Sequence, residues 1–407
     1  MKNPLKILIN GAGRGCLNLT KTANAMGLYT IVTGMEGPCI PIADKVYREV
    51  HPGHPKEVLE VAKMENVDAV VTTCNDMGLE SVGYCCDQLG LTGLSQTSAQ
   101  AASNKCLMKE LFVKNAVRTA RFFKIHNENE LKKKVAELSY PIIIKATDLQ
   151  GSKGICIVRE ETTLISSFNE VMYLTRKDYC IVEEFIIGTE FGAQAFVYHG
   201  EVLFVLPHGD ETIMCKTAVP VGHYMPYKMN AELASDVDTQ AHKAIKALGL
   251  DNCAVNIDFI ERDNKAYVIE LTGRGGANGL TDITGMFYGI NYYEMILHMA
   301  LGNNPKEVFN RKLSMPHASK SEIIKSAKSG VVRNIFVPQK EQSEINMFIE
   351  EGSKVRTFTN CNDAIGEIFV YGDSLDECNQ KINEITNEIN IEIAEYEHIK
   401  KNSQVSR

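Results

Sequence analysis

Short apolar runs alternate with amphipathic stretches along the first 100 residues. A glycine-rich turn follows the first run and leads into a helical pattern that continues to about Met26. Helices and strands that alternate at these lengths predict parallel strands joined by crossovers, so residues 1–103 are expected to form a doubly wound α/β domain. The runs with the length and composition of buried strands are 5–10, 29–33 and 69–72, and the clearest amphipathic helix is 55–63.

The pattern changes after a helix at 104–114. Four short strands and two helices then predict a small α+β lobe at about 118–185, which long antiparallel strands and an 18-residue helix follow. Residues 104–304 are therefore expected to form a second, two-lobed domain, and 305–407 a third, smaller α/β domain. The elements expected in these two domains include strands 121–125, 141–145, 155–158, 180–186, 254–260, 266–271 and 367–371, and helices 128–138, 164–174, 231–248 and 375–389. The third domain also contains the apolar segment 331–337.

Composition narrows the class of protein. The 407 residues are 44% hydrophobic and 23% charged, which is typical of a globular protein of several domains. A formal net charge of -8 argues against broad attraction to nucleic acid or anionic membranes. No apolar run approaches the ~20 residues of a membrane span and no signal peptide is evident, so a cytoplasmic location is expected. The 12 cysteines contain no Cys-x-x-Cys pair and are interpreted as reduced, packed thiols.

The first glycine turn, Gly11-x-Gly13-x-Gly15, is open to three interpretations. It can serve tight strand-to-helix geometry, hold a small anionic group on its backbone amides, or bind a nicotinamide or flavin nucleotide. The dinucleotide fingerprint places its third glycine one position later, and Thr33-Gly34 stands where an acidic residue is expected.

A second glycine loop, at residues 148–154, follows a strand that ends in Lys145. Gly151 and Gly154 would let backbone amides approach phosphate oxygens, and Ser152 and Lys153 add donors. The loop is not a Walker A sequence and, taken alone, is more often an ordinary turn.

Asp258 and Glu270 strengthen the case for a phosphate site. If Asp263, Asn264 and Lys265 form a three-residue hairpin loop, Asp258 lies directly opposite Glu270, with Cβ atoms about 4.5–5.5 Å apart. Two like charges so close inside apolar strands favour a cation or a proton between them. Such a pair suits magnesium, which shares its ligands with nucleotide phosphates. A register error with one acid in solvent is the alternative.

Arg274 follows Glu270 by four residues and is flanked by glycines, including Gly275 and Gly276. A guanidinium beside a metal and phosphates can hold a carboxylate or stabilise a phosphoryl group in transit. The glycines would allow a substrate to approach the main chain.

In their order and spacing, these pieces resemble the nucleotide site of the ATP-grasp superfamily, and the resemblance spans most of the chain. It implies a doubly wound pre-ATP-grasp domain, a two-lobed α+β ATP-grasp core and a small α/β C-terminal domain. The segments that carry it are Asn104-Lys105, the strand ending in Lys145, the loop to Gly154, residues 182–186, residues 188–190, Asp258-Phe259 and residues 269–274.

The resemblance also assigns roles. Asp258 and Glu270 would bind Mg²⁺ (or Mn²⁺), and Arg274, with Lys153, would act on the acyl phosphate or its parent carboxylate. Thr272 stands where the family commonly has Asn, which puts the geometry of a second metal in doubt. ATP would be bound by Lys105, Lys145, Gln150, Gly151, Ser152, Gly154, Glu183, Glu184, Phe185, Ile186 and Glu190.

The implied activity is a carboxylate-amine ligase. Phosphorylation by ATP would convert a poor electrophile, a carboxylate, into an acyl phosphate that an amine attacks, with ADP and phosphate as products. The partners would be small carboxylates and amines, and a homodimer is compatible with the resemblance. Alternatives are a bicarbonate-activating enzyme like carbamoyl-phosphate synthetase or biotin carboxylase, a non-catalytic nucleotide sensor, and an NAD-dependent oxidoreductase using the first glycine turn.

The family often places acceptor-substrate contacts between core strands, where this chain has Pro207-His208-Gly209-Asp210 and Gly222-His223-Tyr224. His208, Lys216 and His223, with Gly275 and Gly276, are therefore candidate substrate residues. For either histidine, a structural role is at least as good an interpretation.

Overall fold

The computed structural model describes residues 4–149, 154–214 and 218–395. Their contacts divide the chain into two compact units that each combine distant segments. The three domain boundaries expected from the sequence stay predictions. The first unit comprises 1–205, 229–275 and 296–304, and the second 206–228, 276–295 and 305–407.

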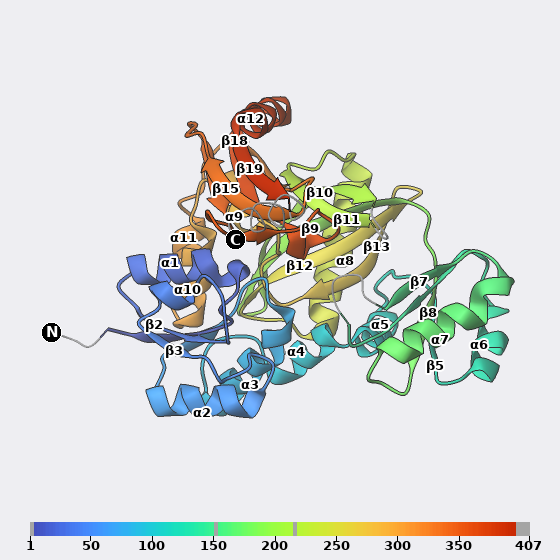
Figure 1. Ribbon diagram of the computed structural model, residues 1–407. Coiled ribbons are helices and arrows are strands. Elements are labelled where there is room, and N and C mark those ends of the chain that lie inside the picture. Colours follow the sequence, from blue (N-terminus) through green and yellow to red (C-terminus); the bar gives the residue numbers. More distant parts are fainter. Residues whose placement is uncertain (1–3, 150–153, 215–217, 396–407) are drawn as a thin grey trace, which may run out of the picture. The chain divides into compact units, whose positions relative to one another are not determined.

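The first unit begins with a parallel four-stranded sheet in the order β3-β2-β1-β4. Helices cover both of its faces, with α1 and α2 on opposite sides (Figure 1). This confirms the doubly wound fold, although α1 begins only at Leu17 because Arg14–Cys16 form a 3-10 turn after the glycines. The elements are β1 (Lys6–Asn10), α1 (Leu17–Ala25), β2 (Tyr29–Thr33), β3 (Lys45–Tyr47), α2 (Pro55–Glu65), β4 (Ala69–Val71), α3 (Leu79–Leu89) and α4 (Gln96–Ser103).

A small lobe of the same unit contains an antiparallel sheet in the order β5-β8-β6-β7, drawn in green in Figure 1. Alternating positions of these strands and one face each of α6 and α7 share a core that includes Ile144, Phe168 and Val182. The helices and strands expected within residues 118–185 are therefore present, and their ends differ from the expected ones by a few residues. The elements are β5 (Phe122–Ile125), α6 (Glu128–Val135), β6 (Ile142–Lys145), β7 (Ile155–Val158), α7 (Leu164–Leu174) and β8 (Cys180–Glu184).

The rest of the first unit is an antiparallel sheet, β13-β12-β9, against which α8 packs. Before β9 the chain forms α5, and after β9 it turns at His199 and Gly200, both with positive φ, into β10. The elements are α5 (Lys105–Lys114), β9 (Thr189–Tyr198), β10 (Glu201–Met214), α8 (Ala231–Leu248), β12 (Cys253–Arg262) and β13 (Lys265–Thr272).

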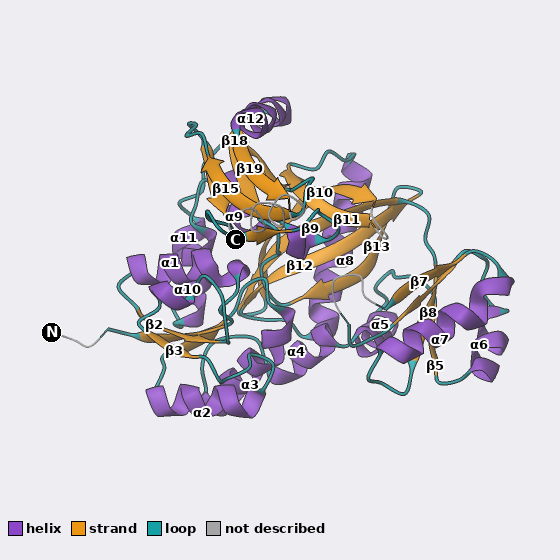
Figure 2. Ribbon diagram, viewed as in Figure 1, coloured by secondary structure: helices purple, strands orange, loops and turns teal. Residues whose placement is uncertain are grey.

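The second unit contains two antiparallel sheets (Figure 2). The larger has the order β10-β11-β14-β18-β16, with α9 and α12 packed against it, and the smaller is β17-β15-β19. The elements are β11 (Ala218–Met225), α9 (Leu280–Tyr288), α10 (Tyr292–Ala300, whose last residues belong to the first unit), α11 (Lys306–Phe309), β14 (Ala318–Ile324), β15 (Gly330–Phe336), β16 (Ser343–Met347), β17 (Lys354–Val355), β18 (Gly366–Gly372), α12 (Leu375–Glu388) and β19 (Asn390–Glu395).

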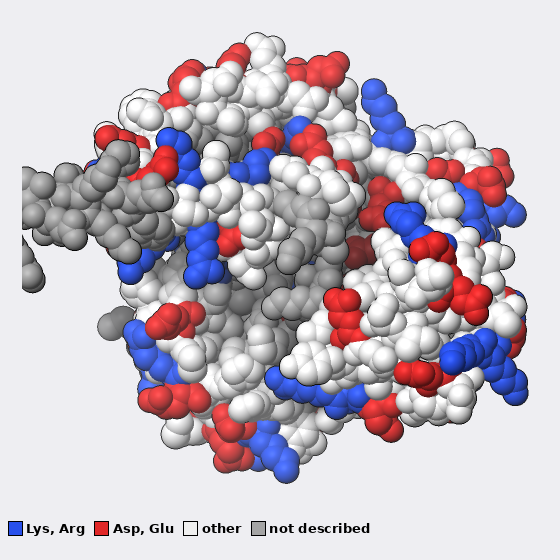
Figure 3. Space-filling view, turned by 45° about the vertical axis from the view of Figure 1, so that its right-hand side comes forward, with Lys and Arg blue, Asp and Glu red and all other residues white. Residues whose placement is uncertain are grey.

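The distribution of charge on one face of the molecule and the hydropathy of the described helices are both unexceptional. On the face shown in Figure 3, basic and acidic side chains are interspersed, with no broad area of one sign. Within the described residues, no helix combines the length and hydropathy needed to span a bilayer.

Candidate active site

The hairpin of β12 and β13 carries the two carboxylates expected to bind metal. Asp258 lies directly opposite Glu270, as predicted. The predicted three-residue loop is wrong: the turn consists of Asp263 and Asn264 alone, both with positive φ, as a tight two-residue hairpin requires. A β-bulge at Ile269 adds the residue that restores the pairing of the two acids.

Both carboxylates are oriented by neighbouring side chains. Lys105 Nζ donates to Glu270 Oε2, and this ammonium holds the pKa of Glu270 below its usual range. Asn256 Nδ2 donates to Asp258 Oδ1 at 3.1 Å, and Gln194 Nε2 donates to Asn256 Oδ1 at 2.5 Å. The hairpin thus presents two anionic oxygen donors on one face, which is the ligand chemistry of a hard divalent cation.

Three lysines and one buried glutamate lie on the elements expected to hold phosphate. Lys105 and Lys109 are one helical turn apart on α5, and Lys145 ends β6. Glu183 on β8 is 2% exposed; its Oε2 accepts a hydrogen bond from Lys145 Nζ at 3.0 Å and lies 3.6 Å from Lys109 Nζ. Its Oε1 has no hydrogen-bond partner among the described residues. The Glu183 carboxylate is therefore the counterion of Lys109 and Lys145.

Lys109 was not recognisable as a site residue in the sequence. Its side chain is almost completely buried, and Nζ also donates to Thr119 Oγ1 at 2.6 Å. Burial lowers the pKa of Lys109 to about 8, against the opposing attraction of Glu183. Burial also opposes ionisation of Glu183, but the two lysines hold its pKa below the usual range.

We expect this buried lysine to make stability depend on alkaline pH. Between about pH 8 and the ordinary lysine pKa of about 10.4, the unfolded chain binds more protons at this position, so stability rises with pH. Urea unfolding of the wild-type protein and Lys109→Met, followed by circular dichroism from pH 7 upward, measures this contribution. The wild-type protein should gain stability relative to the variant within that window. Parallel pH profiles would contradict the assignment.

Arg274 is held by an acidic residue that the sequence did not single out. Its Nε and Nη2 donate to Asp76 Oδ1 and Oδ2, both at 2.7 Å, and Thr272 Oγ1 donates to Asp76 Oδ1 at 3.0 Å. Arg274 Nη1 donates to the carbonyl oxygen of Gly275 at 3.0 Å. Burial raises the pKa of Asp76, but the guanidinium outweighs it and the net shift is downward. Thr272 thus connects β13 to the pair formed by Asp76 and Arg274.

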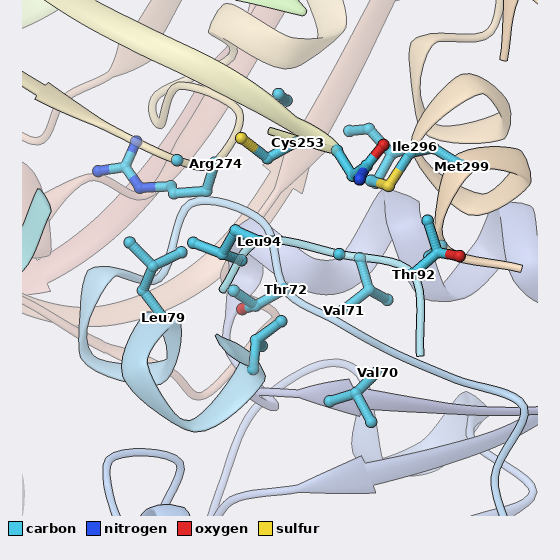
Figure 4. A pocket seen from close by; sticks show the side chains of 16 residues that line it. Val70, Val71, Thr72, Leu79, Thr92, Leu94, Cys253, Arg274, Ile296 and Met299 are labelled. Atoms are coloured by element: carbon cyan, nitrogen blue, oxygen red, sulfur yellow. The ribbon is translucent and has the colours of Figure 1, made fainter. Parts of the chain in front are cut away.

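A small apolar cavity adjoins this ion pair. It is lined by residues of β4, α3, β12 and α10, and its free space is about 20 Å³, close to that of one water molecule. Figure 4 shows the Arg274 guanidinium directed away from Cys253. Gly273 packs here too, since a Cβ would lie 3.2 Å from Leu94 Cδ1. Gly273 is therefore closely packed against neighbouring leucine side chains.

Comparison with known proteins assigns the family. The family description "Phosphoribosylglycinamide synthetase, ATP-grasp (A) domain" matches residues 103–213. The crystal structure of phosphoribosylglycinamide synthetase from Anaerococcus prevotii is 45% identical, with a TM-score of 0.86 over 96% of this chain and 100% of that one. The chain belongs to the ATP-grasp superfamily.

Two further similar proteins share less sequence with this chain. The crystal structure of an L-amino acid ligase from Bacillus licheniformis has a TM-score of 0.80 at 20% identity, over 97% of this chain and 100% of that one, which is a likeness of fold. Alanine–anticapsin ligase from Bacillus subtilis is 26% identical over 266 residues, 60% of this chain. The chain spans only 56% of that curated relative.

The structure describes several of the other positions predicted to bind the nucleotide. Gly154 has a φ of +66°, and its carbonyl accepts from Ala146 N at 2.8 Å, which closes the base of the glycine loop. Glu184 pairs with Arg262 Nη1 at 2.7 Å. Phe185 is partly buried, Ile186 is buried, and Glu190 is exposed on β9. Gln150, Gly151, Ser152 and Lys153, with Lys216, lie outside the described residues.

The candidate substrate histidines lie in the second unit, together with an acid that the sequence did not assign. His208 and His223 both contact Asp210. Burial raises the pKa of Asp210, but these two contacts outweigh burial and hold the pKa well below its usual range. Burial holds the pKa of His208 below its usual range. Gly276 is buried in this unit, where its carbonyl accepts from Thr281 Oγ1 at 3.0 Å.

Proposed function

We propose that the protein is an ATP-dependent carboxylate-amine ligase that forms an amide through an acyl phosphate and releases ADP and phosphate. The observation that carries the proposal is the opposed pair Asp258 and Glu270, with the Lys105 ammonium already within hydrogen-bonding reach of Glu270. A metal between these acids and a lysine beside them form a site for a triphosphate. Catalysis then rests on positioning and charge neutralisation, without a covalent enzyme nucleophile.

Mg²⁺ (or Mn²⁺) is the ion that fits this donor set best. Asp258 and Glu270 would hold it, and it would neutralise charge on the phosphates during transfer. The ion would compete with Lys105 for Glu270, and the displaced ammonium would turn to a phosphate oxygen. Lys145 would make a second phosphate contact. Asp76 and Thr272 would fix the Arg274 guanidinium, leaving its remaining N–H groups for the acyl phosphate or the carboxylate.

We propose an α-amino acid as the activated carboxylate. Relatives named alanine–anticapsin ligase and D-alanine–D-alanine ligase, at 26% identity each, are named for the ligation of amino acids, which supports this class. The likeness to biotin carboxylases, 17–18% identical, is one of fold and does not favour bicarbonate. A cytoplasmic location and a homodimer remain predictions.

Product analysis tests the proposal. The purified chain is given ATP, Mg²⁺ and a matrix of amino acids and amines, and nucleotides and phosphate are quantified together. We expect ADP and phosphate in equal amounts, with an amide, only when both co-substrates are present. AMP and pyrophosphate would contradict the acyl-phosphate route. ATP binding without turnover on any combination would favour a sensor, bicarbonate-stimulated hydrolysis a carboxylase-like enzyme, and stabilisation by NAD(P) alone an oxidoreductase.

A further inference from the structure

Two histidines and one aspartate meet on a single face of the second unit's larger sheet. Asp210 on β10 lies directly opposite His223 on β11. His208 is two residues before Asp210 on the same strand, so strand alternation places all three side chains on one face. Neither strand belongs to the hairpin that carries Asp258 and Glu270.

Gly209, between His208 and Asp210, leaves room for an aromatic ring on the opposite face of the sheet. The Tyr224 ring lies against Gly209, where a Cβ would come within 2.0 Å of the ring carbon Cζ. Gly209 is opposite Tyr224 in the register. The aromatic ring therefore occupies the reverse face, and the three polar side chains share the other.

The cluster is buried, and its hydrogen bonding is incomplete. His208 is 1% exposed and His223 is 4% exposed. Both rings use Nδ1 toward the same Asp210 oxygen, at 3.0 Å from His208 and 2.6 Å from His223. The Nε2 atoms of both rings are buried and have no hydrogen-bond partner among the described residues. Buried polar atoms are normally hydrogen-bonded, so two such nitrogens in one cluster point to a ligand beyond the described residues.

The dimensions match those of a transition-metal site. One nitrogen from each ring and one Asp210 oxygen lie within 4.8 Å of one another. Two imidazoles that share a tetrahedral zinc ion, with bonds of about 2.0–2.1 Å, have ring centroids roughly 5 Å apart. The centroids of His208 and His223 are 5.5 Å apart, with the rings nearly perpendicular at 85°. Ligand atoms around a tetrahedral zinc ion lie roughly 3.3 Å apart. An ion bound here would therefore replace the two hydrogen bonds to Asp210 and separate the groups by less than about 1 Å.

We propose that His208, Asp210 and His223 form a binding site for one divalent transition-metal ion of the Zn²⁺ class. Imidazole nitrogens favour Zn²⁺ and its neighbours, whereas magnesium prefers an all-oxygen shell, so this site is chemically distinct from the pair Asp258 and Glu270. Three protein ligands leave a fourth tetrahedral position for water or a Lewis-basic group of a bound molecule. The side chain of Asp210, 23% exposed, keeps one side of the cluster open to such a group. The inference does not depend on the proposed ligase activity.

Cobalt titration tests the site. The full-length chain is treated with chelator and titrated with Co²⁺ in the absence of ATP, because tetrahedral Co²⁺ absorbs visibly and reports on nitrogen ligands. We expect one equivalent to bind with this absorption and Zn²⁺ to displace it. His223→Ala should weaken binding by at least about 100-fold, since it removes a direct ligand. His242→Ala, which changes an exposed histidine of α8, is the matched control and should bind normally.

Two further measurements keep the test decisive if His223→Ala folds poorly. Glu270→Gln should leave the cobalt spectrum unchanged, because the proposed ligands lie elsewhere. X-ray absorption of the Zn²⁺-loaded wild-type protein should show two imidazole ligands, and it requires no variant. An oxygen-only shell, loss of the cobalt absorption in Glu270→Gln, or no stoichiometric binding would each overturn the proposal.

Discussion

Glu270→Gln should lower kcat by on the order of 1,000-fold, equivalent to about 4 kcal/mol of transition-state stabilisation. The amide keeps the size and shape of the side chain but removes the charge that would hold the metal opposite Asp258. It also removes the acceptor charge that Lys105 uses, so the ammonium loses its ionic partner on β13. Initial rates of ADP release at saturating ATP, with metal concentration varied, measure the effect.

The control is an exposed glutamate of α2, Glu60, changed in the same way. Glu60→Gln should leave turnover unchanged, and Asp258→Asn should reproduce the loss seen in Glu270→Gln. A folded Glu270→Gln enzyme with wild-type turnover would refute the metal assignment. Activity lost together with the circular dichroism spectrum would instead indicate a structural role for Glu270.

Glu183→Gln should destabilise the first unit by about 3–5 kcal/mol, the usual cost of removing one partner from a buried ion pair. The substitution leaves Lys109 and Lys145 facing each other without their shared carboxylate. Because Lys109 is buried, water cannot replace the lost charge there. Urea unfolding followed by circular dichroism measures the loss, in the absence of nucleotide so that ATP binding does not contribute.

Removing one of the stranded charges should recover part of that loss. The double variant Glu183→Gln/Lys109→Met is expected to be more stable than Glu183→Gln alone, since one unpaired buried ammonium is gone. Glu137→Gln removes a carboxylate from a solvent-exposed pair with Arg121 and should shift the midpoint little. Equal midpoints for Glu183→Gln and Glu137→Gln would show that Glu183 is not the counterion of the lysines.

Regular amphipathic segments were predictable from the sequence. The helix expected at 231–248 is found as α8 (Ala231–Leu248), because a strong apolar face coincides with clear end signals. The Asn230 side chain accepts from Leu233 N, and Gly249 has a φ of +64°. The carboxylate pair was also predictable, but the hairpin reaches that register by a shorter turn and a bulge that cancel each other.

Elements whose buried positions are polar were not predictable. Strand β14 (Ala318–Ile324) buries Ser319, Lys320 and Ser321 in succession, so it has no apolar alternation to detect. Lys320 is accommodated because Nζ donates to Glu211 at 2.5 Å and to Asn379 at 2.7 Å. These partners come from distant segments, and a local pattern carries no information about them.

Asp76 and Lys109 were not predicted for the same reason, because their partners come from distant segments. Asp76 meets Arg274 across 198 positions of sequence, and it lies in a short 3-10 turn without a recognisable motif. On α5, Lys109 is 2% exposed whereas Leu107 is 36% exposed, the reverse of what hydropathy predicts. The buried carboxylate of Glu183, which β8 contributes, compensates the charge of Lys109 there.

The first turn of α5 carries cations where the helix dipole disfavours them. Asn104 caps the helix through Cys106 N and Leu107 N, but the first residue is Lys105 and Lys109 follows one turn later. The positive end of a helix dipole repels such cations. Glu270 and Glu183 offset part of this repulsion. If a polyanion binds there, as proposed, it would offset the repulsion further, and this would contribute to its binding energy. Substitutions that remove this repulsion would stabilise the helix itself and would weaken binding of the anion.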